Sequence, residues 1–254
     1  MLIFLGDSQP LGYEIGIEIK QGPEHMPQEA RDKIYNPMAI HPECRPDLAY
    51  PELLSKSLSQ DYVNLAYGGT CHQRHLNTFQ QYLKKHDVPR GSTVFLNSNC
   101  KSRGFLVDSE TGQALDFMNT VFMMAQIDYT IPLTDWHMYL KDPKNLNICD
   151  MLMRISPYQN LQAVNHIGLL CDSLGLNFLY FPISPCLLYN NDDIPGFSPS
   201  EMITLKPSQM FTLPDDVSPW MNRPGHWLQH HLSAQGQAAL ASDLNQVYLE
   251  RCAS

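Results

Sequence analysis

The chain opens with the stretch LIFLGDS at residues 2–8, which decides its fold. Four apolar residues in a row predict a strand that is buried on both faces, the kind found in parallel sheets. Gly6 is expected to let the backbone turn sharply, so that Ser8 emerges at the carboxyl end of this strand. Because open α/β sheets bind ligands at that edge, Ser8 is the first candidate for a functional side chain. Glycine, aspartate and serine also make ordinary turns, so the rest of the chain has to decide between the two interpretations.

Strand and helix patterns alternate along the remaining chain. Apolar runs predict further strands at residues 62–66, 93–96 and 177–182. Apolar residues at helical spacing predict helices at 48–58, 73–86, 114–126, 157–174 and 234–250, the fourth of them stopped by Gly175. This alternation predicts an α/β fold, in which a parallel sheet is covered by helices on both faces.

Length and composition favour a single domain. A chain of 254 residues with 43% hydrophobic content can bury a sizeable core, and we expect residues 1–254 to form one domain. Two segments, at about 9–46 and 184–225, are rich in proline and too punctuated for long regular structure. They are expected to form long loops, and loops on a rigid scaffold commonly shape substrate pockets.

The charge and the cysteines exclude several classes of protein. With 17 Lys and Arg residues against 26 Asp and Glu residues, the net charge is -9, so a nucleic-acid partner is not expected. The sequence has neither a basic segment before a cleavable apolar stretch nor a window of about 18 apolar residues, which predicts a cytoplasmic protein without a membrane span. Seven scattered cysteines without a Cys-x-x-Cys pair predict reduced thiols, not disulfides or a zinc site.

Four segments in order along the chain resemble the blocks of the SGNH (GDSL-type) hydrolases. The segments are Gly6-Asp7-Ser8, residues 64–69 (NLAYGG), residues 97–99 (NSN) and residues 231–236 (HLSAQG). The four residues that give the family its name fall at Ser8, Gly69, Asn99 and His231. The resemblance implies a three-layer α/β/α sandwich with a flavodoxin-like central sheet, and serine esterase or acyl-transfer chemistry. The chain contains no Gly-x-Ser-x-Gly elbow, which excludes the more familiar α/β-hydrolase pattern.

The chemistry of acyl transfer explains why these residue types are needed. By this resemblance Ser8 is the nucleophile, and His231 is the base that takes its proton and later protonates the leaving group. The oxyanion would be received by the backbone amides of Ser8 and Gly69 and by the side chain of Asn99. Gly68 and Asn97 are the nearest competitors for the last two roles. The third block also departs from the family pattern Gly-x-Asn-Asp, with Asn97 in place of glycine and Cys100 in place of aspartate.

The last block lacks the aspartate that usually lies three residues before the histidine. Leu228 occupies that position. Three explanations stay open: a Ser8–His231 dyad oriented by a backbone carbonyl, a carboxylate from Asp215 or Asp216 that folds back, or a site that binds without catalysing. We favour the dyad or a substitute acceptor, because a site without chemistry would not require the serine, the two oxyanion donors and the histidine.

Cofactors are not expected, and the substrate class follows only in outline. The histidine pairs His226/His230 and His72/His75 could hold a metal, but no Asp or Glu lies between residues 217 and 242, and we expect no metal site. The sequence predicts a hydrolase acting on a small-molecule acyl ester or an acylated sugar, with acyl transfer or silent ligand binding on the same fold as alternatives. The candidates for substrate contact are Asp7, Gln9, Tyr67 and Trp227.

Overall fold

The computed structural model describes the two ends of the chain and the elements between them, with gaps. The structure describes residues 1–7, 9–12, 15, 45–67, 71–97, 104–107, 114–117, 146–181 and 232–252. Within these ranges the strands are β1 (Leu2–Leu5), β2 (Tyr62–Asn64), β3 (Thr93–Asn97), β4 (Gly104–Val107), β5 (Ala114–Phe117) and β6 (Asn177–Phe181). The helices are η1 (Gln9–Leu11), η2 (Pro46–Leu48), α3 (Tyr50–Leu58), α4 (His72–Leu83), α7 (Leu146–Leu174) and α10 (Ala234–Arg251).

Four strands form one sheet in the order β2-β1-β3-β6, and every neighbouring pair in it is parallel. The chain runs from β1 to β2 on one side and then crosses to the other side of β1 to form β3. Such a reversal is the topological switch point of a doubly wound sheet, and here it lies between β1 and β3. The predicted mostly parallel, flavodoxin-like sheet is therefore confirmed.

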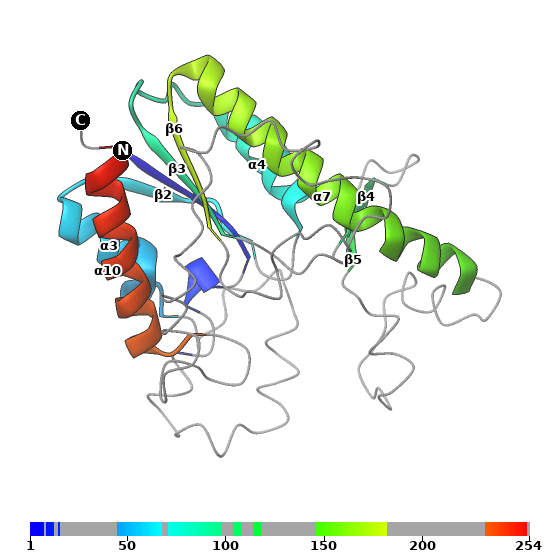
Figure 1. Ribbon diagram of the computed structural model, residues 1–254, viewed down its shortest axis with the longest axis horizontal. Coiled ribbons are helices and arrows are strands. Elements are labelled where there is room, and N and C mark those ends of the chain that lie inside the picture. The colour runs from blue at the N-terminus through cyan, green and yellow to red at the C-terminus, as the bar shows by residue number, and fades with distance from the viewer. Residues whose placement is uncertain are drawn as a thin grey trace.

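Helices cover both faces of this sheet, as Figure 1 shows. Alternate side chains of β1 point to opposite faces: Phe4 packs in the cluster with α3 and α10, whereas Leu5 packs in the cluster with α4 and α7. Phe4 stacks on Phe95 of β3, with ring centroids 5.0 Å apart. The central strands are thus buried on both sides, which is why they appear in the sequence as uninterrupted apolar runs.

Two predicted elements differ from the structure. Residues 114–117 form strand β5, antiparallel to β4, so the predicted helix at 114–126 is wrong over this part; the remainder lies outside the described residues. A short apolar segment fits both the strand period and the helix period, so the sequence pattern alone does not distinguish a strand from the start of a helix here. Helix α7 begins at Leu146 and not at residue 157. Pro157 is typical of a helix start, but here it lies inside the helix.

The ends of the helices follow local rules. Gly175 takes a left-handed conformation with φ of 66° just after α7, as the predicted stop requires. At the start of α10, the side chain of Ser233 accepts a hydrogen bond from the backbone amide of Gly236 at 3.2 Å. This bond satisfies one of the amides that the first turn of a helix leaves without a partner inside the helix.

Replacing Ser233 with alanine should destabilise the protein by about 1 kcal/mol, because this buried amide of α10 loses its acceptor. Urea unfolding followed by circular dichroism measures the change. Ser173→Ala is the matched control, since Ser173 is an exposed serine near the end of α7, and it should change the free energy of unfolding by less than about 0.5 kcal/mol. Equal losses for both variants would contradict the capping role.

In the described part of the chain, Cys71, Cys171 and Cys252 are not joined in disulfides. Burial raises the pKa of the Cys171 thiol far above its ordinary value. Among the helices described, none has both the length and the apolar character needed to cross a bilayer.

Candidate functional site

The carboxyl ends of β1 and β2 are joined beyond the strands themselves. The amide of Leu65 donates to the carbonyl of Phe4 at 2.8 Å, and the amide of Tyr67 donates to the carbonyl of Gly6 at 2.9 Å. The backbone pairing therefore continues to Gly6 on one chain segment and to Tyr67 on the other. Gly6, which precedes Asp7, therefore lies next to Tyr67, which precedes Gly68.

Asn97, the last residue of β3, meets Asp7 at the switch point between β1 and β3. Its Nδ2 donates to Oδ1 of Asp7 at 3.4 Å. The Asn97 side chain has no exposed surface, and Asp7 is 9% exposed. A buried carboxylate needs such donors, because burial without hydrogen bonds is costly for a charged group.

Gly6 is required for this contact because any larger residue at position 6 would collide with Asn97. Its φ lies outside the left-handed region, so the sharp turn expected there does not depend on conformational freedom of glycine. A Cβ at this position would instead overlap Oδ1 of Asn97 and approach Cγ of Pro10 to 2.8 Å. Gly6 is therefore needed for the close approach of its neighbours.

Asn64, the last residue of β2, fixes the short helix η1 that follows Ser8 in the chain. Its Nδ2 donates to the carbonyl of Pro10 at 2.8 Å, and its Oδ1 accepts from the amide of Ala66 at 3.1 Å. The Asn64 amide is thus bonded on both sides, which sets its orientation. It ties η1 to the end of the neighbouring strand.

The starts of α3 and α10 meet at the same edge of the sheet. The amide of Tyr50, the first residue of α3, donates to Oε1 of Gln237 in the first turn of α10 at 2.9 Å. Burial, followed by the charge of Asp7, raises the pKa of the Tyr50 hydroxyl well above its ordinary value, so this group stays neutral. Leu232, which precedes α10, is fully buried in the core cluster that contains Tyr50.

The structure describes the neighbours of the predicted catalytic residues and not the residues themselves. Ser8, Gly69, Asn99 and His231 lie outside the described residues, as does Trp227. Asp7, Tyr67 and Asn97, which lie one or two residues from the first three, are brought together at the carboxyl edge of the sheet. The four catalytic assignments therefore stay predictions.

The surroundings of Asn97 bear on its competition with Asn99 for the oxyanion role. An oxyanion donor has to reach the substrate, and the Asn97 side chain is fully buried and bonded to Asp7. This favours Asn99 as the donor. In the sequence Asn97 is that competitor and the residue in place of the family's glycine, and nothing in the sequence pairs it with Asp7.

The predicted substrate contacts have different surroundings. Asp7 is nearly buried and bonded to Asn97, so it faces the protein interior. Tyr67 is half-buried, and the Arg74 guanidinium lies 5.4 Å from the centroid of its ring. Gln9 is the first residue of η1 and directly follows Ser8 in the chain.

The histidine pair His72 and His75 is fully buried at the start of α4. The centroids of the two rings are 5.6 Å apart, and the centroid of the His72 ring is 5.8 Å from that of the Tyr180 ring. The backbone amide of His72 donates to Oδ1 of Asn160 in α7 at 3.1 Å. Within the described ranges no three His, Cys, Asp or Glu side chains are grouped as metal ligands would be.

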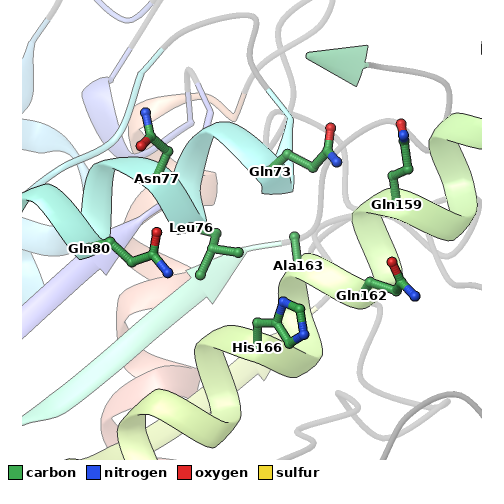
Figure 2. A pocket seen from close by; sticks show the side chains of 8 residues that line it. All are labelled: Gln73, Leu76, Asn77, Gln80, Gln159, Gln162, Ala163 and His166. Carbon is green, nitrogen blue, oxygen red and sulfur yellow. The ribbon is translucent and has the colours of Figure 1, made fainter. Parts of the chain in front are cut away.

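A hollow of about 290 Å³ lies between α4 and α7 (Figure 2). It is lined by Gln73, Leu76, Asn77, Gln80, Gln159, Gln162, Ala163 and His166. Its lining contains no Asp, Glu, Lys or Arg, and it contains none of the predicted site residues. The candidate site is therefore the carboxyl edge of the sheet, where the asparagine contacts are.

Comparisons with known proteins find likeness in structure alone. No family model matches the chain, and no curated protein matches it. One similar solved structure is a carbohydrate esterase whose active site displays divergent catalytic and non-catalytic binding functions, with 14% identity and a TM-score of 0.50. Another is the acetyl xylan esterase Est2A from the rumen bacterium Butyrivibrio proteoclasticus, with 12% identity and a TM-score of 0.49. Each alignment covers 98% of this chain, which spans 64% and 63% of the two neighbours' lengths. At these identities the likeness concerns the fold.

Proposed function

We propose that this chain is a serine-dependent ester hydrolase of the SGNH type, formed by a single domain. Ser8 is the nucleophile, His231 is the base, and the oxyanion is bound by the amides of Ser8 and Gly69 and by the side chain of Asn99. The observation that carries the proposal is the meeting of Asp7 and Asn97 at the switch point. It places the chain positions just before Ser8 and Asn99 at the edge where open α/β sheets act on their ligands.

The reaction would run in two steps through an acyl-enzyme. Ser8 Oγ forms a bond to the ester carbonyl carbon while His231 takes the hydroxyl proton, and the carbonyl oxygen becomes an oxyanion. The bond to the leaving alcohol then breaks, and His231 gives the proton to that alcohol. Water attacks the acyl-enzyme in the same way, releasing the acid and restoring Ser8.

The substrate class we propose is a small-molecule acyl ester or an acylated sugar. A protein of net charge -9 is a poor match for a polyanionic substrate, which favours a neutral ester. The fold likeness to a carbohydrate esterase agrees with this substrate class but does not identify a particular substrate. Leu228 leaves His231 without the usual aspartate, so we propose that a backbone carbonyl or another acceptor orients the imidazole.

Covalent capture tests this function directly. A fluorophosphonate probe should modify Ser8, identified by mass spectrometry of the tryptic peptide, and the rate should fall about 10³-fold or more in His231→Ala, which lacks the base. The Ser173→Ala protein is the control, since it removes an exposed serine of α7 and should label at the parental rate. A parent that neither labels at Ser8 nor hydrolyses any of a panel of short and long acyl esters would overturn the proposal in favour of silent binding.

A further inference from the structure

We infer that Asn64 and Asn97 are positioning residues that hold Asp7 and Pro10 on either side of Ser8, and we call this pair the amide clamp. We call residues 7–10, which contain the proposed nucleophile, the nucleophile turn. The inference rests on the proposed role of Ser8. Asn97 holds Asp7, one residue before Ser8, and Asn64 holds Pro10, two residues after it. The two asparagines are the last residues of β3 and β2, the strands on either side of β1.

Both clamp bonds are donated by side-chain amides to oxygens of the turn. Asn97 Nδ2 donates to the Asp7 carboxylate, and Asn64 Nδ2 donates to the Pro10 carbonyl. An aspartate at either position would keep the size of the side chain and lose the donor. The clamp can therefore be opened from either side with little change in volume.

Placement on strands makes the clamp rigid. β1 is hydrogen-bonded to both β2 and β3, so the two asparagines cannot move apart without breaking the sheet. A nucleophile must be held close to its productive position, and a misplacement of about 1 Å can lower the rate by about 10²-fold. Sites supported by strands and by hydrogen bonds of neighbouring side chains keep such tolerances better than sites on free loops.

The pH dependence of Asn97→Asp separates positioning from a loss of packing. Two carboxylates would then face each other across the switch point, and their repulsion raises the pKa of one of them. In acid the pair shares a proton, and its O–H restores a donor between the two groups; as the pH rises, that proton is lost and the groups repel. Tyr50, the titratable group of α3 beside Asp7, stays neutral throughout this range because burial and Asp7 raise its pKa.

The matched control is Asn177, which lies in the same sheet at the amino ends of the strands. Asn177 begins β6, and its Nδ2 donates to the carbonyl of Gly91 and to Oγ1 of Thr93, both at 3.3 Å. Asn177→Asp removes the same kind of donor from the same sheet, far along the strands from the nucleophile turn. It should therefore affect folding stability without affecting Ser8.

The experiment compares the rate of fluorophosphonate labelling of Ser8 in Asn97→Asp, Asn64→Asp and Asn177→Asp with the parental rate at each pH from 5 to 9. We expect the labelling rate of both clamp variants to be about 10²-fold below the parental rate at pH 8. For Asn97→Asp the rate relative to the parent should recover in acid. For Asn177→Asp the rate should change by less than twofold at every pH. Melting temperatures are measured in parallel. Should Asn97→Asp fail to fold, the half-buried Asn64 supplies the second variant.

The outcomes separate the two proposals. If the parent labels at Ser8 and both clamp variants label like Asn177→Asp at every pH, the amide clamp is wrong and the proposed function stands. If the parent neither labels at Ser8 nor hydrolyses any of the panel of acyl esters, the proposed function itself fails. A common fall in melting temperature with unchanged labelling would reduce the clamp to a purely structural role and would also overturn the inference.

Discussion

Hydrolysis of an acyl ester by a Ser8→Ala protein should be about 10⁶-fold slower in kcat than by the parent. The hydroxyl is the only atom of Ser8 that forms the acyl bond in the proposed mechanism, so its removal eliminates the acyl-enzyme entirely. The remaining rate would come from substrate binding and the other oxyanion donors, which by themselves still accelerate hydrolysis over water. KM should change little, because the methyl side chain of alanine leaves the rest of the pocket intact.

Steady-state hydrolysis of a chromogenic acyl ester, corrected for the spontaneous rate, measures this effect. The double variant Ser8→Ala/His231→Ala provides the sharper comparison. Residues that act as one unit are strongly non-additive, so the double variant should be no slower than the slower of the two single variants. A Ser8→Ala protein that keeps more than about a tenth of the parental kcat would remove Ser8 from the mechanism.

A methyl group at residue 6 should damage both stability and reactivity. In Gly6→Ala the new Cβ would overlap Oδ1 of Asn97 and crowd Cγ of Pro10, so the side chain or the backbone has to move. Overpacking of this kind destabilises proteins by about 1–3 kcal/mol. Because Asn97 holds Asp7, the same movement should slow the labelling of Ser8 by about 10²-fold.

Gly91→Ala is the matched control for this prediction. Gly91 has a φ of 79° and open space around its missing Cβ, and it lies near the amino ends of the strands. Alanine there costs about 1–2 kcal/mol through backbone strain and should leave Ser8 labelling unchanged. Urea unfolding and labelling rates of both variants are compared with the parent. Parental labelling by Gly6→Ala would show that the close approach of Asn97 has no bearing on the nucleophile turn.

Local sequence rules were enough to predict most of the fold. The runs at β1, β3 and β6 are buried on both faces, and this is the reason they could be recognised as strands of a parallel sheet. Gly175 ended α7 where it was expected to. The two errors have separate causes. The short apolar segment of β5 fits either a strand or a helix, and it pairs with the nearby strand β4. Pro157 is typical of a helix start, but α7 continues on its amino-terminal side to Leu146.

The sequence assigns the candidate site by residue type and order, and these assignments stay predictions; the contacts around the site could not be predicted from it. The register of β1 and β3 brings Leu5 opposite Leu96. The next residues are Gly6, directly after β1, and Asn97, the last residue of β3. Only this register reveals why residue 6 must be glycine and why Asn97 meets Asp7. No pattern along a single strand contains that information, because it arises between strands.

The contact between Tyr50 and Gln237 joins residues that are 187 positions apart in the chain. Helix α10 shares a core cluster with Phe4 and Phe95 of the sheet and with α3, all of which lie within the first 97 residues. During synthesis these apolar side chains emerge well before the helix that shields them. At ribosomal elongation rates the uncovered face would stay open to water for on the order of ten seconds, a window in which the growing chain is most exposed to aggregation and most dependent on chaperones.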